Sequence, residues 1–187
     1  MKVIQLYKNE AELIKKAMDN NRDAQRVLFD LHSPKMLSVC RYYIRDAHHA
    51  EEVMLNGFFK VFTNLKGFKN EGSFEGWIRR IMVRESLSYL RQKKPMEFGS
   101  ETLEMNEDLE NHINSEMAVE EIQDLIDNLP AGYKMVFVLY AIEGYKHKEI
   151  ALMLNITEGT SKSQLFKARK KLQENIKILN KASNGTH

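Results

Sequence analysis

The sequence predicts an all-α protein made of two small helical domains joined by an acidic linker. Apolar residues recur at the three- and four-residue spacing of amphipathic helices near both ends of the chain. Charge divides the chain in the same way, because residues 1–94 carry a net charge of +7, residues 95–133 carry −11 and residues 134–187 carry +6. Basic blocks of this kind are typical of modules that bind polyanions. The predicted organisation is a first domain at 1–94, a proline-led linker with few apolar residues at 95–115, a second domain at 116–180 and a tail at 181–187.

The first domain is predicted to be helical throughout. Asn9 and Glu12 have the spacing of a capping box, which opens a short helix to about residue 18. A second helix is expected at 22–31. A third is expected at 34–44, because Ser33 precedes a proline, the residue favoured at the first position of a helix.

The clearest helix of the chain follows Asp46, a predicted cap. Its apolar residues form a core-facing stripe, namely Ala50, Val53, Met54, Gly57, Phe58, Val61, Phe62 and Leu65. Leu55 and Phe59 lie outside this stripe, one turn apart. Such a pair either forms a surface for a partner or widens the contact with the core.

A loop at 66–72 separates this helix from another that Ser73 is predicted to cap, with Phe74, Trp77, Ile78 and Ile81 facing inward. Arg80, Arg84 and Arg91 fall on one line of that next helix, within about 40° of one another at 100° per residue. The loop carries Phe68, Lys69 and Asn70. Cations beside an aromatic ring and an amide are what binding of an unstacked nucleic-acid strand requires. A solvated arginine face is the alternative interpretation.

Residues 144–172 predict a helix-turn-helix. A first helix begins near Lys146 and buries Ile150, Ala151 and Leu154, and the period breaks at 155–157. Thr157 is predicted to cap a second helix with Leu165, Ala168 and Leu172 on its apolar side. The opposite side carries Lys162, Phe166, Lys167 and Lys170. This division suits a helix that enters the major groove of duplex DNA, although an amphipathic surface helix with a solvated basic face has the same pattern.

Other classes of protein are not favoured. No apolar run approaches the ~20 residues of a membrane span, and the first residues lack a signal-peptide core, so we expect a soluble, cytoplasmic protein without direct membrane insertion. The one cysteine, Cys40, is expected to be buried and excludes an intramolecular disulfide and a cysteine-based zinc cluster. The histidines, among them His48, His49 and His147, have no metal-ligand spacing, and no phosphate loop or nucleophile elbow occurs. We therefore expect no catalytic residues, no cofactor, no metal and no enzymatic activity.

Two segments carry a family resemblance. AEEVMLNGFFKVFTNLKGFKNEGSFEGWIRRIMVRESLSYLR, at 50–91, resembles the promoter-melting domain of bacterial extracytoplasmic function (ECF) sigma factors. LPAGYKMVFVLYAIEGYKHKEIALMLNITEGTSKSQLFKARKKL, at 129–172, resembles their second domain, which reads the minus-35 promoter element. The segment IRRIMVRESLSYLR is most similar to the Bacteroidetes-type members of this family. The resemblance implies an initiation factor that binds core RNA polymerase and promoter DNA and has no catalysis of its own.

The resemblance also implies roles for individual residues. The helix that docks on the polymerase clamp would carry Glu51, Glu52, Leu55 and Asn56, with Phe59 one turn further. Loop 66–72 would capture a flipped base of the minus-10 strand, beside the helix that carries Arg80, Arg84 and Arg91. The minus-35 contacts would come from Lys162, Ser163, Phe166, Lys167 and Lys170. The chain departs from the family at Leu55, where glutamine is common, and at Ser161, where a valine usually packs the recognition helix; a buried serine there should loosen that helix by about 1 kcal/mol.

Two other functions remain open at this level. A sigma-like decoy would sequester an anti-sigma factor without engaging polymerase, but such decoys tend to lose the residues that read DNA. A free-standing helix-turn-helix regulator would need neither loop 66–72 nor the arginine line. For the initiation factor, we expect an anti-sigma factor as a third partner.

Overall fold

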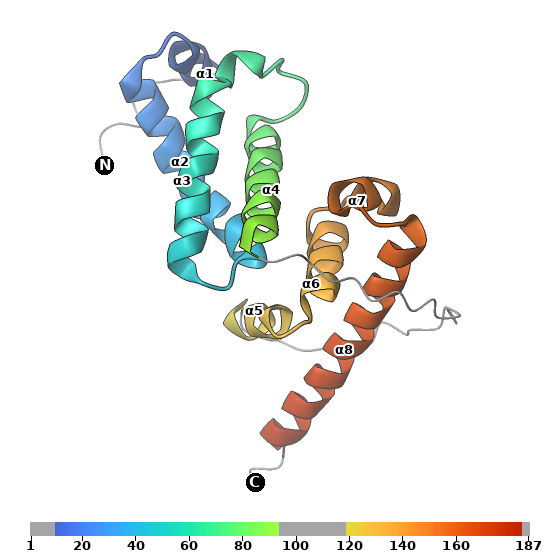
Figure 1. The fold of residues 1–187 in the computed structure, drawn as a ribbon. Coiled ribbons are helices and arrows are strands. Elements are labelled where there is room, and N and C mark those ends of the chain that lie inside the picture. Colours follow the sequence, from blue (N-terminus) through green and yellow to red (C-terminus); the bar gives the residue numbers. More distant parts are fainter. Residues whose placement is uncertain (1–9, 94–118, 185–187) are drawn as a thin grey trace. The chain divides into compact units, whose positions relative to one another are not determined.

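The computed structural model describes residues 10–93 and 119–184 and divides the chain into two compact units, Met1–Pro95 and Met96–His187. Every described element is helical, and no strand occurs within those two ranges (Figure 1). The all-α prediction is confirmed, with a helix-turn-helix in the second unit. The linker expected at 95–115 and the cap expected at Asn9 lie outside the described residues. No described helix combines the length and the apolar character needed to span a membrane.

Unit 1 is a bundle in which three long helices pack against one another and a short one covers α2 and η2. Its elements are α1 (Glu10–Met18), α2 (Arg22–Tyr43), α3 (Ala47–Thr63), the 3-10 turn η2 (Leu65–Gly67) and α4 (Phe74–Lys93). The predicted stripe of α3 is buried except for Phe62, which is half-buried. Cys40 is fully buried, as predicted.

The helices expected at 22–31 and 34–44 are one continuous helix, α2, which contains Pro34. The prediction of a break was wrong, although proline removes one backbone hydrogen bond from a helix interior. Buried side chains lie on both sides of the proline, with Leu28 before it and Met36 and Val39 after it. Packing of this shared face against the bundle therefore holds the helix together through a locally weakened turn.

Helices α3 and α4 of unit 1 approach each other closely at Gly57. A Cβ atom at Gly57 would lie 2.3 Å from the Sδ atom of Met82, whose side chain is fully buried. No side chain larger than a hydrogen fits there unless Met82 moves. Gly57 therefore sets how near the two helices come.

Unit 2 contains α5 (Val119–Asp127), α6 (Ala131–Phe137), the π-helical turn η3 (Val138–Ile142), α7 (His147–Leu154) and α8 (Glu158–Asn184). Leu125 and Leu129 pack against Ala168 and Leu172 of α8. The Nζ atom of Lys134 lies 2.6 Å from Oδ1 of Asp127, and only 8% and 2% of these side chains are exposed. This buried ion pair joins the end of α5 to α6.

Three predicted helix caps are confirmed. The side-chain oxygens of Asp46, Ser73 and Thr157 accept hydrogen bonds from backbone N–H groups three residues further on, over 2.8, 3.1 and 3.0 Å respectively. Each bond satisfies a donor that the first turn of a helix leaves without a partner. The starts of α3, α4 and α8, which carry the candidate site residues, are therefore well defined.

Candidate nucleic-acid interface

The arginine line of unit 1 lies on the exposed side of α4, as predicted. Ile78, Met82 and Val83 face the core, which leaves Arg80, Arg84 and Arg91 in solvent. Among the described residues, no carboxylate pairs with Arg80 or Arg84. Two neighbouring guanidinium groups without a local counter-charge can bind successive phosphates of a nucleic-acid strand.

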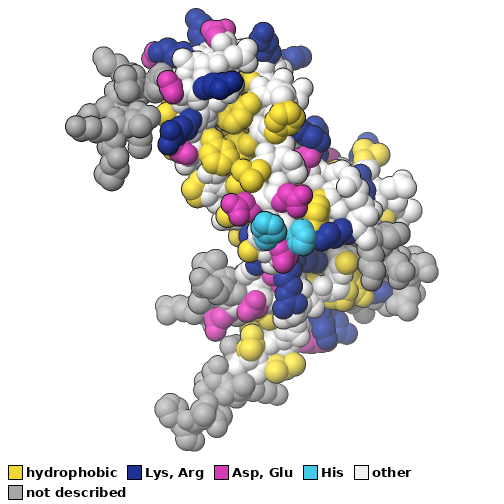
Figure 2. Space-filling model, turned by 60° about the vertical axis from the view of Figure 1, so that its left-hand side comes forward, with side chains coloured by type: hydrophobic (Ala, Val, Ile, Leu, Met, Phe, Trp, Pro, Cys, Tyr) yellow, Lys and Arg dark blue, Asp and Glu magenta, His cyan; other side chains and the backbone are white. Residues whose placement is uncertain are grey.

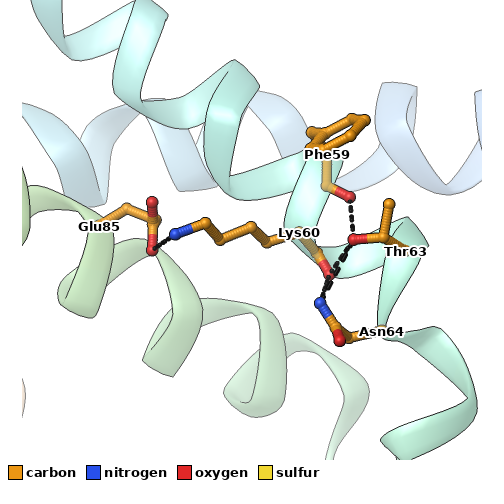
Figure 3. A network of polar contacts seen from close by, with 5 residues as sticks. All are labelled: Phe59, Lys60, Thr63, Asn64 and Glu85. Atoms are coloured by element: carbon orange, nitrogen blue, oxygen red, sulfur yellow. Dashed lines mark hydrogen bonds and ion pairs between the residues drawn. The ribbon is translucent and has the colours of Figure 1, made fainter.

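The nearest acid along α4, Glu85, is occupied by another residue. Its Oε1 atom lies 2.7 Å from Nζ of Lys60 on α3, so this carboxylate neutralises a lysine and not the arginine line (Figure 3). The same region closes the end of α3, because Thr63 Oγ1 donates to the carbonyl oxygen of Phe59 and Asn64 Nδ2 donates to that of Lys60. Side chains at the end of α3 therefore bind the carbonyl oxygens of its last full turn, at Phe59 and Lys60.

Phe68 is buried at the base of the loop. It is only 7% exposed, and its ring centroid lies 5.2 Å from that of Phe74 and 5.5 Å from that of Trp77. The ring anchors the loop to the start of α4, because burial of an aromatic ring beside two others is favourable. The expected contact of Phe68 with a base stays a prediction.

The other two candidate DNA-binding residues of the loop, Lys69 and Asn70, lie at its tip. Lys69 and Asn70 are exposed, and Asn70 has a left-handed backbone with a φ of 60°. Asparagine adopts this conformation more readily than most residues. The amide of Asn70 and the ammonium group of Lys69 therefore extend from a loop that Phe68 holds in place.

The outer face of α3 presents an apolar pair with a polar border. Leu55 is 48% exposed and Phe59 is 70% exposed, while Glu51, Glu52 and Asn56 lie in solvent beside them. This exposure shows that the pair does not widen the core, and its role as a surface for a partner stays a prediction. Figure 2 shows hydrophobic side chains gathered on the surface of unit 1. An apolar patch of this kind on a helical face is typical of a surface that binds another protein.

The basic face of α8 is present in unit 2, with one exception. Lys162 and Lys170 are exposed and Phe166 and Lys167 are half-buried, whereas Ser163 is only 7% exposed. The Ser163 hydroxyl donates to the carbonyl oxygen of Thr160 over 3.0 Å. Ser163 was expected among the groups that enter the DNA groove, and the structure instead directs it toward the interior.

An acid on α8 already compensates part of this basic face. The Nζ atom of Lys162 lies 3.1 Å from Oε1 of Glu158, one turn earlier in the helix. Both side chains are about half exposed, at 47% and 50%, so solvent screens the pair and a phosphate can compete for the lysine.

The two helices of the helix-turn-helix are joined by a polar contact that the sequence did not suggest. Asn155 forms the turn with a left-handed backbone, φ 55°. Across it, Nδ1 of His147 lies 2.9 Å from Oγ of Ser161, which is fully buried. The sequence predicted that α8 would be less stable at Ser161 because serine packs less well than valine. In the structure the serine hydroxyl instead forms a hydrogen bond with His147. The two residues lie on different helices with a turn between them, so no periodicity within one helix could have predicted the pair.

The surroundings of His147 disfavour its charged form. Burial lowers the pKa of His147, and the nearby cations Lys162 and Arg169 lower it further, while Glu158 acts in the opposite direction. The imidazole ring also stacks on that of Tyr140, with 4.6 Å between the centroids. His147 is therefore held as a neutral, hydrogen-bonded ring near neutral pH.

Comparison with known proteins agrees with this geometry. Residues 28–95 match the family model for Sigma-70 region 2, and residues 119–172 match the model for Sigma-70, region 4. The chain is 27% identical to the ECF RNA polymerase sigma factor SigW of Bacillus subtilis, with 89% of this chain and 96% of SigW covered. It is 25% identical to the ECF RNA polymerase sigma-E factor of Haemophilus influenzae, with 89% of this chain and 95% of that protein covered.

Solved structures share the fold. CnrH in complex with the cytosolic domain of CnrY gives a TM-score of 0.51 at 18% identity and covers 89% of this chain and 96% of that one. The sigma factor RpoE in complex with the anti-sigma factor NepR, from Bartonella quintana, gives 0.54 at 18% identity, covering 82% of this chain and 96% of that one. At such identities the likeness concerns the fold alone.

Two helical units, matching regions 2 and 4 in that order, define a sigma factor for transcription initiation. The chain belongs to the sigma-70 family, and its relatives show that it is an ECF sigma factor.

Proposed function

We propose that this sigma factor divides promoter opening and promoter reading between its two units. In this proposal, residues 1–94 bind core RNA polymerase and the unpaired minus-10 strand, residues 116–180 read the duplex minus-35 element, and residues 95–115 tether them. The single observation that carries the proposal is that Arg80 and Arg84, which have no carboxylate partner among the described residues, lie on a different unit from the basic face of α8. A decoy that only captures another protein has no need of two exposed cationic helix faces.

The minus-10 contact would be made by α4 and the loop before it. Unstacking a base costs a few kcal/mol, which contacts in the open state must offset. Arg80, Arg84 and Arg91 would hold phosphates of the separated strand, and Lys69 and Asn70 would meet the extruded base. Phe68 would act indirectly, because its buried ring fixes the loop.

The polymerase contact would be made by α3. Leu55 and Phe59 supply an apolar centre, and the surrounding polar residues, Glu51, Glu52 and Asn56, supply a charged border. A buried apolar centre with a polar rim is the usual composition of a protein interface. Leucine in place of the family's glutamine at position 55 enlarges this centre.

The minus-35 contact would be made by α8. Lys162, Lys167 and Lys170 would meet phosphates or purine edges, and Phe166 would meet a sugar or a thymine methyl group. Ser163 would contribute through its hydrogen bond inside α8 and not by touching DNA.

We further propose that the protein acts in the cytoplasm without enzymatic activity of its own, and that it is of the Bacteroidetes type.

An anti-sigma factor would control the free protein. The support is that both CnrH and RpoE, which share this fold, were solved in complexes, the latter with an anti-sigma factor. The exposed apolar pair of α3 would be available to such a partner when polymerase is absent.

Run-off transcription with purified core polymerase tests the proposal. Genomic fragments are transcribed with and without the full chain, and we expect discrete transcripts that depend on the chain. A variant that places charges on the outer face of α3, Leu55→Glu with Phe59→Glu, should lose transcripts together with polymerase affinity. No chain-dependent transcript, alongside tight capture of a membrane anti-sigma factor, would instead identify a decoy.

A further inference from the structure

The contact between His147 and Ser161 joins the N-terminal ends of the two helices of the helix-turn-helix. His147 is the first residue of α7, and Ser161 lies in the first turn of α8. Their side chains meet at 2.9 Å, with Ser161 fully buried. A buried hydroxyl needs a partner, so the contact constrains both helices.

A third element holds the imidazole ring of His147. Tyr140 belongs to η3, and its ring is nearly parallel to that of His147, at an interplanar angle of 21°. Arg169, two turns along α8 from Ser161, lies with Cζ 5.7 Å from the centre of the Tyr140 ring. Turning α8 about its axis would therefore disturb the hydrogen bond and the ring contacts together.

The rotation of α8 matters because its cationic face begins directly after Ser161. Lys162 is the next residue, and Phe166 and Lys167 follow one turn later. A rotation of about 10° moves atoms roughly 6 Å from a helix axis by about 1 Å. A displacement of this size weakens a hydrogen bond to a base edge, whereas a contact with a backbone phosphate is less sensitive to it.

We propose that His147 is a positioning residue for promoter reading: its hydrogen bond to Ser161 sets the rotation of α8 and thereby the discrimination between base sequences. His147 acts through α8 and not by touching a base. The inference rests on the proposed function, in which α8 reads the minus-35 element. It gives a reason for serine where the family usually packs a valine.

Two substitutions at position 147 separate the hydrogen bond from the ring stacking. His147→Phe keeps a ring against Tyr140 and removes the Nδ1 atom, whereas His147→Asn removes the ring and keeps a polar atom on Cγ that can reach Ser161. Ser161→Ala removes the bond from the other side with a smaller change of volume. The three variants form a matched set.

The experiment uses polymerase holoenzyme assembled with the full chain. A duplex library with a randomised upstream segment is first selected with the wild-type holoenzyme, and the preferred sequence is then compared with a scrambled one. We expect His147→Phe and Ser161→Ala each to lower the ratio of the two affinities about fivefold, the equivalent of one net hydrogen bond, with little change for the scrambled duplex. His147→Asn should stay within about twofold of wild type, and combining His147→Phe with Ser161→Ala should add nothing further.

A ratio unchanged in both His147→Phe and Ser161→Ala would overturn the inference, as would an equal loss of affinity for both duplexes, which marks general weakening of the unit. If His147→Phe does not fold, the comparison of Ser161→Ala with wild type carries the test. Failure of the proposed function gives a different result, because the wild-type holoenzyme would then select no upstream sequence at all.

Discussion

The two units of this sigma factor hold their helices together in different ways. The helices of unit 1 pack closely, as where Gly57 meets Met82, and the ion pairs described between them each keep at least one partner at the surface, such as Lys60 with Glu85 and Glu10 with His32. Unit 2 contains an ion pair with both partners buried, Asp127 with Lys134, and a half-buried contact of His147 with the buried Ser161. Apolar packing tolerates small shifts, whereas a buried polar link has one good geometry. The unit assigned to reading base pairs is therefore the one in which an ion pair with both partners buried joins two helices.

The largest effect should come from breaking the buried pair of unit 2. Lys134→Ala removes the cation that is paired with the buried carboxylate of Asp127 and should lower the free energy of unfolding of unit 2 by about 3–5 kcal/mol. Trp77, the single tryptophan, lies in unit 1, so its fluorescence follows that unit while far-UV circular dichroism follows both. Denaturant unfolding should show an early transition by circular dichroism and an unchanged one at Trp77.

Replacing both partners supplies the control for this pair. Asp127→Leu combined with Lys134→Met should restore most of the stability, because no charge is then left buried. If Lys134→Ala left both transitions in place, directional polar links would not be what holds unit 2 together.

Unit 1 should respond to a change of volume. Gly57→Ala places a methyl group where Met82 lies, and overpacking of this kind costs about 1–3 kcal/mol. The Trp77 transition should move to lower denaturant. Gly67→Ala is the matched control, because a Cβ atom there would meet nothing within 4 Å, and an equal shift in both variants would mean that the helix crossing is not responsible.

The division of labour should appear in DNA binding. Arg80→Ala with Arg84→Ala should lower binding of holoenzyme to a forked promoter on the order of tenfold and reduce the log–log salt slope by about 1.4, since each phosphate contact with a single strand contributes about 0.7. Binding to a duplex that carries only the upstream element should not change. Lys162→Ala with Lys167→Ala should lower binding to that duplex. If either double variant lost equal affinity for the forked promoter and for the upstream duplex, the two units would not have separate roles.

A smaller effect of opposite sign is expected at the internal pair of α8. Glu158→Gln releases Lys162 and removes a negative charge near the proposed phosphate contacts, so duplex affinity should rise by about two- to threefold, as expected for an exposed ion pair. Glu174→Gln, which frees Lys171 from a pair 3.9 Å long further along the helix, is the control. Unchanged affinity in Glu158→Gln would show that Lys162 does not contact the duplex.

The smallest effect should be a dependence of unit 2 on pH. The folded pKa of His147 lies below its ordinary value of 6.5, so the unfolded chain takes up a proton first as the pH falls. The free energy of unfolding of unit 2 should therefore decrease as the pH falls below about 6.5. Above that pH, His147 should not make the free energy of unfolding depend on pH. His147→Phe should flatten this part of the profile, and parallel profiles for the two proteins would rule out His147 as the source.

Local patterns accounted for most of the helices and for the exposed charges. The caps at Asp46, Ser73 and Thr157 and the stripe of α3 depend on spacings of three and four residues, which a sequence displays directly. The exposure of Arg80, Arg84, Leu55 and Phe59 follows from the same periodicity, because burying one face of a helix leaves the other in solvent.

Long-range packing accounts for the rest. The continuity of α2 through Pro34, the burial of Phe68 beside Trp77 and the contact of His147 with Ser161 each depend on which elements meet in the folded chain. Proline suggests a break and a loop phenylalanine suggests exposure when only neighbours in the sequence are considered. Burial against distant helices outweighs these local preferences. Each apolar side chain removed from water gains about 1.5–3 kcal/mol, so several on one helix exceed the roughly 3 kcal/mol that a proline costs in its interior.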